Sequence, residues 1–272
     1  MTCDVSGYDS NAAPVCRRSP RLAAACTEPP IGPALRPCTA EEAAHNLCIE
    51  PTIGRTLGAY PLDIAAAPAR ECATYLQQYW VGPNIGKLDL GGGRVLTGYN
   101  TYRGTLVEPA NPQRQLRDTL LVMPGDLASA RERLPGFREL AVSATRRLAF
   151  FYSVPTDRFV LRYAHFLSQG PKSRRAALFG WHRDTDVATP DDDGRPISVA
   201  HTVIVKLTDD APGAPAWQLQ VAAAADPFSY GAAAGSACVF WSALWHASVL
   251  PQVADSCLKL ALFYDRVPLP SV

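Results

Sequence analysis

The sequence lacks the long hydrophobic runs that mark membrane proteins and secretory precursors. No stretch approaches the roughly 18 uninterrupted apolar residues that a membrane-spanning helix needs. The N-terminal segment MTCDVSGYDSNAAPVCRRSP contains no apolar core of the kind found in signal peptides. We therefore expect a soluble intracellular protein, in the cytoplasm or the nucleus, with no membrane partner.

A strong charge of either sign is also missing. The formal net charge is +1 and the sequence pI is near 7.6. This balance creates no field that would by itself argue for binding to nucleic acid or to a membrane surface. Hydrophobic residues make up 47% of the chain, enough to build a sizeable core.

The cysteines lack the spacing of a metal or disulfide module. There are eight, and no two of them form a CxxC pair. Those in the N-terminal quarter are ten or more residues apart, and no secretory signal accompanies them. A disulfide framework and a zinc module are the alternatives, but this pattern favours free thiols. The six N-terminal cysteines are Cys3, Cys16, Cys26, Cys38, Cys48 and Cys72.

The N-terminal half combines an irregular segment with helices. Residues 1–40 are rich in Pro, Ala, Ser and Cys without sustained periodicity, which predicts a poorly ordered arm. This arm is also a candidate for binding a partner. A helix is predicted at Thr39–Asn46, where Thr39 is followed by Glu42 in the manner of a capping box.

Two longer helices and a pair of strands are predicted next. The helices cover Ala66–Trp80 and Asp126–Arg147, the second interrupted near Pro135. Between them, Leu88–Gly104 predicts two strands joined by a glycine-rich turn. The three glycines of that turn match neither the P-loop nor the dinucleotide-binding pattern.

The C-terminal half changes to short strands separated by Gly, Pro and Asp. Such runs predict an antiparallel barrel or sandwich, with the preceding helices packed against one sheet. We expect residues 1–40 to form the arm, 41–150 a helical and β extension, and 151–272 the core. The strand-like runs are FFYSV, RFVLRYAHFL, ALFGWH, AHTVIVKL, WQLQVA, SACVFW and CLKLALFYD.

Three residues of this half have the chemistry of a metal site. His182 and Asp184 are two residues apart, so on a strand their side chains point to the same face. His246 follows the apolar run SACVFW and is the candidate third ligand. Two histidines and one carboxylate on one face of an octahedral ion leave the opposite positions open, which suits non-haem iron(II). Taken singly, either histidine is as well explained by packing.

With these residues in place, the sequence resembles the iron(II)/2-oxoglutarate-dependent dioxygenases over about residues 155–268. The resemblance rests on the HxD pair, the distal histidine, and the phrases RYAHFL, FGWHRDTD, AHTVIVKLTDD and SACVFWSALWHASVLP in that order. It implies an α+β fold with a double-stranded β-helix core of the jelly-roll or cupin type, supported by N-terminal helices. It also implies Fe(II) and 2-oxoglutarate as cofactors, and O₂ and an organic substrate as partners.

The resemblance departs from the family at the co-substrate anchor. Family members place an arginine or lysine soon after the distal histidine, whereas the first cation here is Lys259. Lys206 is a second candidate, since a lysine that faces into an apolar barrel needs an anion, and we rank it above Lys259. Tyr163 is a candidate hydrogen-bond donor to the co-substrate. Ascorbate is the alternative reductant or co-substrate.

Several further roles follow from the resemblance. His165 and His201 match no ligand position and are expected to pack or to support the site. Arg183 should face away from the metal, and the polar loop Asp186–Ser198 is expected to cover the substrate. The tryptophans either wall the site or belong to the core, and they are Trp181, Trp217, Trp241 and Trp245.

The expected reaction is hydroxylation or oxidative demethylation of a C–H bond, coupled to decarboxylation of 2-oxoglutarate. The substrate stays open among proteins, small molecules and nucleobases. The phrase RY…WHRDTD is similar to branches that modify 5-methylpyrimidines or alkylated bases, and Lys172–Arg175 is a short basic run. The alternative outside enzymology is a metal-binding or scaffold barrel without catalysis.

Overall fold

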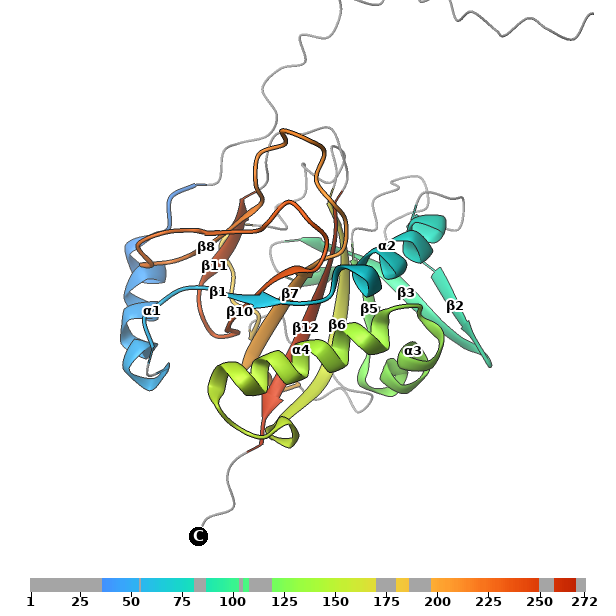
Figure 1. The fold of residues 1–272 in the computed structure, drawn as a ribbon. Helices are drawn as coiled ribbons and strands as arrows, with labels where there is room; N and C mark the ends of the chain where they lie inside the picture. Colours follow the sequence, from blue (N-terminus) through green and yellow to red (C-terminus); the bar gives the residue numbers. More distant parts are fainter. Residues whose placement is uncertain are drawn as a thin grey trace, which may run out of the picture. The chain divides into compact units, whose positions relative to one another are not determined.

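Two antiparallel sheets and four α-helices make up the described part of the computed structural model (Figure 1). All described residues belong to one unit, Gly32–Val272. The predicted arm at 1–40 lies almost wholly outside the described residues, and the predicted boundary near residue 150 stays a prediction. The structure describes residues 36–53, 55–80, 87–102, 105–107, 119–169, 180–185, 197–249 and 257–267.

The helices begin where the sequence predicts them. The capping box is confirmed, because the backbone N–H of Thr39 donates to the carboxylate of Glu42 at 2.7 Å while the N–H of Glu42 donates to the Thr39 hydroxyl at 3.2 Å. The interruption near Pro135 is also confirmed. None of the described helices is both long and apolar enough to cross a bilayer. The helices are α1 (Ala40–Ile53), α2 (Ala66–Trp80), α3 (Leu127–Arg133) and α4 (Phe137–Tyr152).

The larger sheet has nine strands in the spatial order β1-β10-β7-β12-β6-β5-β3-β2, with β4 paired to β3. Its longest pairing joins β12 to β6 and contains a bulge between Phe263 and Tyr264. The strands are β1 (Tyr60–Asp63), β2 (Lys87–Gly91), β3 (Arg94–Tyr102), β4 (Thr105–Val107), β5 (Thr119–Val122), β6 (Phe159–Gln169), β7 (His201–Lys206), β10 (Ser236–Trp241) and β12 (Cys257–Arg266).

The smaller sheet has the spatial order β11-β8-β9, and His182 adds an isolated bridge to β11. Along the chain, β6, the His182 bridge, β7, β8 and β9, β10, β11 and β12 therefore alternate between the two sheets. This alternation is the winding of a jelly roll, so the predicted double-stranded β-helix core is confirmed. The strands of this sheet are β8 (Gln218–Val221), β9 (Phe228–Ser229) and β11 (His246–Val249).

The two faces of the larger sheet bury different cores. Helices α2, α3 and α4 cover the outer face, and Figure 1 shows α4 lying across β6, β12 and β7. The inner face meets the smaller sheet across a second cluster that contains Tyr163, Ile204, Phe240 and Phe263. Since neighbouring strand residues point to opposite faces, this second cluster marks the barrel interior.

One predicted strand is wrong. FFYSV, residues 150–154, forms the last turn of α4 and the turn that follows it. Phe150 is 80% exposed and Ser153 adopts φ 53° to end the helix, so the aromatic run follows a helical period there. ALFGWH contributes only the His182 bridge within the described residues. Cys38, Cys48, Cys72 and Cys238 are free thiols.

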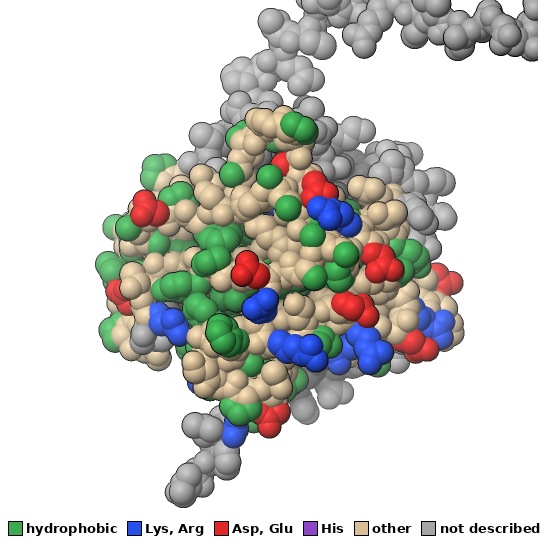
Figure 2. Space-filling model, in the orientation of Figure 1, with side chains coloured by type: hydrophobic (Ala, Val, Ile, Leu, Met, Phe, Trp, Pro, Cys, Tyr) green, Lys and Arg blue, Asp and Glu red, His purple; other side chains and the backbone are tan. Residues whose placement is uncertain are grey.

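The surface over α3 and α4 carries mixed charge. Figure 2 shows basic side chains gathered in this region with acidic side chains among them. The exposed residues of α4 include Arg138, Arg146 and Arg147, but also Glu139. This face therefore lacks the single sign of charge that a phosphate backbone would favour.

Candidate metal centre

Two short segments bring the three predicted ligands together. His182 and His246 form an antiparallel bridge, in which each backbone N–H donates to the other carbonyl, at 3.0 and 2.9 Å. Asp184 lies just beyond the bridge in a turn, and its N–H donates to the carbonyl of Ser242 at 2.9 Å. The segment from His182 to Asp184 is thus not a regular strand, but the bond to Ser242 continues the pairing.

The ligand atoms of the three side chains converge. Nε2 of His182 and Nε2 of His246 each lie 3.6 Å from Oδ1 of Asp184. Ligands in adjacent positions of an octahedral ion, at metal–ligand distances of about 2.1 Å, are about 3 Å apart, so a small inward shift closes the set. Among the described residues, no other group of three or more His, Cys, Asp and Glu side chains could hold a metal.

Each histidine is oriented by a carbonyl two residues before it. Nδ1 of His182 lies 2.7 Å from the oxygen of Gly180, and Nδ1 of His246 lies 2.9 Å from that of Leu244. Because a carbonyl oxygen only accepts, Nδ1 carries the proton and Nε2 keeps its lone pair for a metal. Burial lowers the pKa of His246 to about 4, with the charge of Asp184 acting in the opposite direction. This ring is therefore neutral at neutral pH.

The carboxylate of Asp184 is held by a chain of two hydroxyls, of which only the first contacts it. Oδ2 accepts a hydrogen bond of 2.6 Å from the hydroxyl of Thr202, which lies 2.9 Å from the hydroxyl of Ser242. Since Thr202 has one proton and gives it to the carboxylate, Ser242 donates to Thr202. Both side chains are fully buried. They leave Oδ1 directed at the two imidazoles.

The strand register places the ligands beside one row of inward side chains. Phe263 on β12 lies opposite Thr202 of β7 and opposite Tyr163 of β6. Phe240 on β10 lies opposite Thr202 on the other side, and its ring centroid is 4.5 Å from that of His246. The rings of Tyr163 and Phe263 stack with centroids 4.4 Å apart. Tyr163 is thus buried in the row nearest the ligands.

The ammonium of Lys206 binds polar groups of the protein itself. Its ammonium donates to the carbonyls of Gly231 and Ala232, both at 3.0 Å, and forms an ion pair with the carboxylate of Asp210. Lys206 is fully buried and Asp210 nearly so. These three partners match the three N–H donors of an ammonium, so the buried charge is compensated without a ligand.

Lys259 is also buried, but in different surroundings. It lies opposite Lys206 across the β12–β7 pairing. Its Nζ is 4.5 Å from the ring centroid of Trp217 and 5.0 Å from that of Tyr230, two members of the interior cluster. With the strand period of two, Lys259 shares the inner face with Phe263, two rows deeper in the barrel.

His165 lies inside the barrel in the row between these levels. Its ring centroid is 5.2 Å from that of Tyr163 and 4.7 Å from that of Phe263. Burial lowers the pKa of His165 to about 4, while the charge of Asp184 raises it. Nε2 of His165 has no hydrogen-bond partner among the residues that the structure describes.

His201 occupies the opposite face of its strand. Its Nδ1 lies 3.2 Å from the hydroxyl of Tyr152, and its ring packs against Phe159 and Trp241. Burial lowers the pKa of His201 to about 3. It is a packing residue between the larger sheet and α4.

The tryptophans divide between the interior and the outside of the barrel. Trp217 belongs to the interior cluster beside Lys259. Trp241 packs on His201, while Trp181 and Trp245 make contacts with the segment that begins α1. Of these four, the described contacts place Trp217 in the interior.

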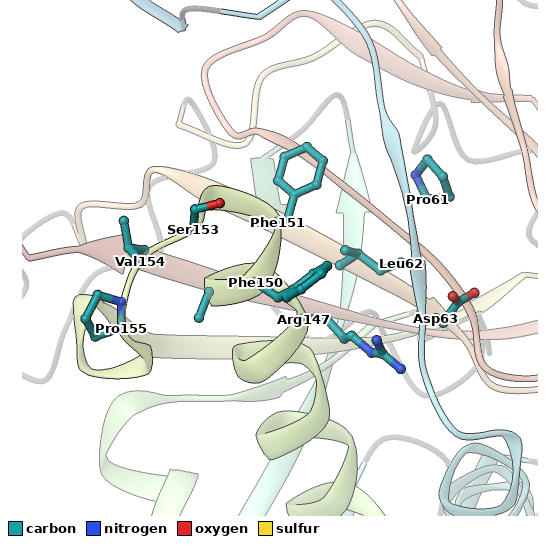
Figure 3. A pocket seen from close by; sticks show the side chains of 10 residues that line it. Pro61, Leu62, Asp63, Arg147, Phe150, Phe151, Ser153, Val154 and Pro155 are labelled. Atoms are coloured by element: carbon teal, nitrogen blue, oxygen red, sulfur yellow. The ribbon is translucent and has the colours of Figure 1, made fainter.

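A surface groove lies away from the ligands. Figure 3 shows it between β1 and the end of α4, with the rings of Phe150 and Phe151 near Pro61 and Leu62. Its walls belong to the outer face of the larger sheet, since Leu62 is part of the cluster under the helices. The candidate metal ligands lie on the inner side, so the groove is not part of the candidate metal centre.

Two predicted features fall outside the described residues. These are most of the loop Asp186–Ser198, of which only the last residues are described, and the basic run Lys172–Arg175. Two supporting residues, Thr202 and Asn46, were not predicted. The alternation that places Ile204 inward also places Thr202 there, so that signal was present in the sequence; nothing in the sequence marks Asn46.

Solved structures with related shapes share little sequence with this chain. AviO1 from Streptomyces viridochromogenes Tue57 is 16% identical, with a TM-score of 0.48 over 86% of this chain and 100% of its own. The non-heme alpha ketoglutarate dependent epimerase SnoN from nogalamycin biosynthesis is 14% identical, with a TM-score of 0.49 over 83% of this chain and 81% of its own.

A third similar structure is a prolyl hydroxylase from Trichoplax adhaerens, in complex with a peptide fragment of the hypoxia inducible factor oxygen degradation domain. It is 12% identical, with a TM-score of 0.46 over 82% of this chain and 90% of its own. No protein-family model and no curated protein matches the sequence.

Proposed function

We propose that this protein is an iron(II)-dependent dioxygenase that couples oxidation of an organic C–H bond to decarboxylation of 2-oxoglutarate. The observation that carries the proposal is the convergence of one carboxylate and two imidazoles, with Oδ1 of Asp184 3.6 Å from each Nε2. This donor set on one face of an ion suits non-haem iron(II) that keeps positions open. Iron(II) bound there would activate O₂ and would be chelated by the keto acid.

The chain's own residues would hold the metal and shield it. His182, Asp184 and His246 are the proposed ligands, with both histidines already in the tautomer that leaves Nε2 available. The Tyr163 and Phe263 rings, stacked beside them, exclude water from one side. The hydroxyl of Tyr163 is the proposed hydrogen-bond donor to the co-substrate.

Lys259 is the proposed anchor for the far carboxylate of 2-oxoglutarate. Lys259 lies on the inner face of β12, four residues before Phe263. At about 3.3 Å per residue, the two residues are about 13 Å apart along the strand. Lys206 has a carboxylate and two carbonyl partners already. Lys259 lies against the rings of Trp217 and Tyr230 in the barrel interior. On this placement we rank it above Lys206, the reverse of the order drawn from the sequence.

The described contacts do not favour one class of organic substrate over another. O₂ and an organic molecule are the proposed partners. A nucleobase stays an alternative substrate, ascorbate an alternative co-substrate, and a barrel that binds metal without catalysis an alternative function. Ascorbate and the barrel without catalysis are outcomes of the test below.

The test is an anaerobic titration of the iron(II)-loaded protein with 2-oxoglutarate, following the weak visible charge-transfer band of the chelate. The proposal expects a saturable band in the wild type, and a band in Lys259→Met only at concentrations at least about tenfold higher, since a buried charge-assisted contact is lost. Bound iron without a band at any concentration would point to ascorbate or to a barrel without this chemistry.

Lys206→Met serves as the comparison. Because its partner Asp210 is then left buried without a cation, this variant should lose stability rather than co-substrate affinity. A folded Lys206→Met protein that binds 2-oxoglutarate more weakly than Lys259→Met does would restore Lys206 as the anchor.

A further inference from the structure

We propose that residues 36–46, which lead into and begin α1, position the metal ligands, and that Asn46 is the principal positioning residue. The inference rests on the proposed function only in requiring that the site holds a metal. It does not depend on which co-substrate or substrate is used. Figure 1 shows α1 beside β8 and β11 of the smaller sheet.

Asn46 fixes the residue that precedes a ligand. Its Oδ1 accepts from the backbone N–H of Trp245 at 2.9 Å, and its Nδ2 donates to the carbonyl of Trp245 at 3.1 Å and to that of Ala222 at 2.9 Å. The N–H of Ala222 donates to the same Trp245 carbonyl at 2.9 Å. Asn46 is fully buried. One side chain thus holds both backbone groups next to His246.

The preceding residue of α1 makes two further contacts. Nε2 of His45 donates to the carbonyl of Ala243 at 3.1 Å, within the turn that leads to His246. The guanidinium of Arg183 lies 3.4 Å from the same nitrogen of His45, in contact but without a hydrogen bond because both atoms carry protons, and 5.4 Å from the ring centroid of Trp245. Arg183 is the residue between the two ligands His182 and Asp184, so α1 reaches both ligand-bearing segments.

The segment that carries His182 is hydrogen-bonded to a residue just before α1. Nε1 of Trp181, next to His182, donates to the carbonyl of Arg36 at 2.8 Å. Arg36 in turn forms an ion pair with Glu42, whose carboxylate also closes the capping box. The start of the helix and the attachment to Trp181 are therefore one hydrogen-bonded unit.

The contacts alternate with the ligands along the chain. Trp181 and Arg183 contact residues 36–46 through their side chains, and Trp245 does so through its backbone. The side chains of the neighbouring His182, Asp184 and His246 converge on one another. Holding the residue next to each proposed ligand restricts the backbone that carries that ligand, and so its orientation. Residues that orient metal ligands in this indirect way change metal affinity by about 10–100-fold when they are removed.

The test compares the variant Asn46→Ala with Thr145→Val in the full chain. Thr145 lies on α4, on the other side of the larger sheet, and its hydroxyl bonds to the carbonyl of Ala141 at 2.8 Å and to Tyr264 at 3.2 Å. Both changes remove side-chain hydrogen bonds from a helix, but only the first touches the ligand segments. The measurements are the Co(II) dissociation constant, the visible d–d spectrum of the bound Co(II), and urea unfolding without metal.

We expect Asn46→Ala to raise the Co(II) dissociation constant by about 10–100-fold and to alter the d–d bands, whereas Thr145→Val keeps the wild-type values even where it lowers stability. The inference is overturned if a folded Asn46→Ala protein binds Co(II) as tightly as the wild type, or if Thr145→Val weakens binding equally. If Asn46→Ala does not fold, His45→Ala is tested in its place by the same two Co(II) measurements. This variant should fold, because it removes a single half-buried hydrogen bond.

The outcomes separate this inference from the proposed function. A wild type that binds Co(II) and is weakened by Asn46→Ala, but gives no band with iron and 2-oxoglutarate, supports the positioning role and refutes the proposed reaction. A wild type that binds neither Co(II) nor Fe(II) refutes both.

Discussion

At the scale of single residues, the proposed metal centre depends on side chains that are not themselves ligands. Thr202 supplies the proton that orients the Asp184 carboxylate, and Ser242 supplies the proton that orients Thr202. All three are buried, so water cannot replace a lost bond at little cost. The chain of two hydroxyls therefore sets which carboxylate oxygen faces the imidazoles.

Thr202→Val should weaken metal binding by about 10–100-fold, because the carboxylate loses the donor that fixes it. The substitution keeps the shape of the side chain, so the fold should persist. Thr202→Ser retains the hydroxyl and should bind metal nearly as the wild type does. Equal Co(II) affinity of the Val and Ser variants, measured by titration, would show that the hydroxyl has no orienting role.

His201 should make the fold sensitive to acid. Its pKa is about 3 in the folded protein and about 6.5 in an unfolded chain. Between these values the unfolded chain takes up a proton that the folded protein refuses, so the free energy of unfolding falls as the pH falls from about 6.5. His201→Phe should reduce this slope by up to about 1.4 kcal/mol per pH unit, measured by urea unfolding between pH 6.5 and 4.5.

Tyr152→Phe is the matched control for that change. It removes the hydrogen bond to Nδ1 of His201 but keeps the buried imidazole that titrates. We expect lower stability with the wild-type slope. If His201→Phe and the wild type show the same slope, the acid sensitivity comes from elsewhere in the chain.

The two lysines show where sequence reasoning stops at this scale. Strand alternation correctly indicated that Lys206 and Lys259 could both be buried. It could not show that Asp210 folds back onto Lys206 after the turn, or that Trp217 and Tyr230 surround Lys259. Trp217 and Tyr230 lie next to β8 and β9 of the smaller sheet, so only the packing of the two sheets brings them to Lys259.

At the scale of elements, the turn between α3 and α4 requires a glycine. Gly136 adopts φ +74°, and a Cβ at this position would lie 2.2 Å from the carbonyl oxygen of Pro68 at the start of α2. The missing side chain thus lets α2 and α4 approach each other. The sequence marked this break through Pro135 alone.

Gly136→Ala should destabilise the protein by about 1–2 kcal/mol for the left-handed backbone, and by about 1–3 kcal/mol more for the clash with α2. Gly213→Ala provides the comparison, because Gly213 has φ +78° but no atom within 4 Å of the added Cβ. It should therefore show the backbone cost alone. Urea unfolding of both variants measures the difference, and equal losses would mean that the approach to Pro68 is relaxed easily.

Elements with one strong local signal were predicted well, and elements with two competing signals were not. α2 has the bounds Ala66–Trp80 in both prediction and structure. The run FFYSV has strand-like composition, but the helix that precedes it continues through it. β11 (His246–Val249) was not predicted as a strand, because four residues between a turn and a proline give no measurable alternation.

At the scale of the whole molecule, the proposed metal would link parts of the chain that are far apart in sequence. The ligands come from the two segments that the His182–His246 bridge joins. A metal that binds only the folded state should stabilise all of it by about 2.7 kcal/mol at a concentration of 100 times the dissociation constant.

That stabilisation should appear as a higher unfolding temperature, by about 5 °C or more, when Co(II) is added to the wild type. His246→Ala should lose this response while remaining folded, because the imidazole is removed from an otherwise packed site. A chelator should return the wild type to the metal-free value. An equal shift in His246→Ala would place the bound metal at another site.

The winding of the two sheets follows from the order of the strands, and here the sequence was most informative. The predicted runs from RFVLRYAHFL to CLKLALFYD include β6, β7, β8, β10 and β12, in that order. The strands that the N-terminal half adds to the edges of the larger sheet were predicted only in part. β1 and β5 are four residues each and pair with β10 and β6, so their place depends on contacts that local composition does not encode.

The bonds from Asn46 to Trp245 span 199 residues of sequence. During synthesis, which adds about 5–20 residues per second, α1 leaves the ribosome many seconds before its partner exists. Contacts of such long range also form late in folding, since closing the intervening loop costs entropy before any bond repays it. The nascent chain therefore lacks the complete set of proposed ligands, and we expect metal loading only once the two sheets have closed.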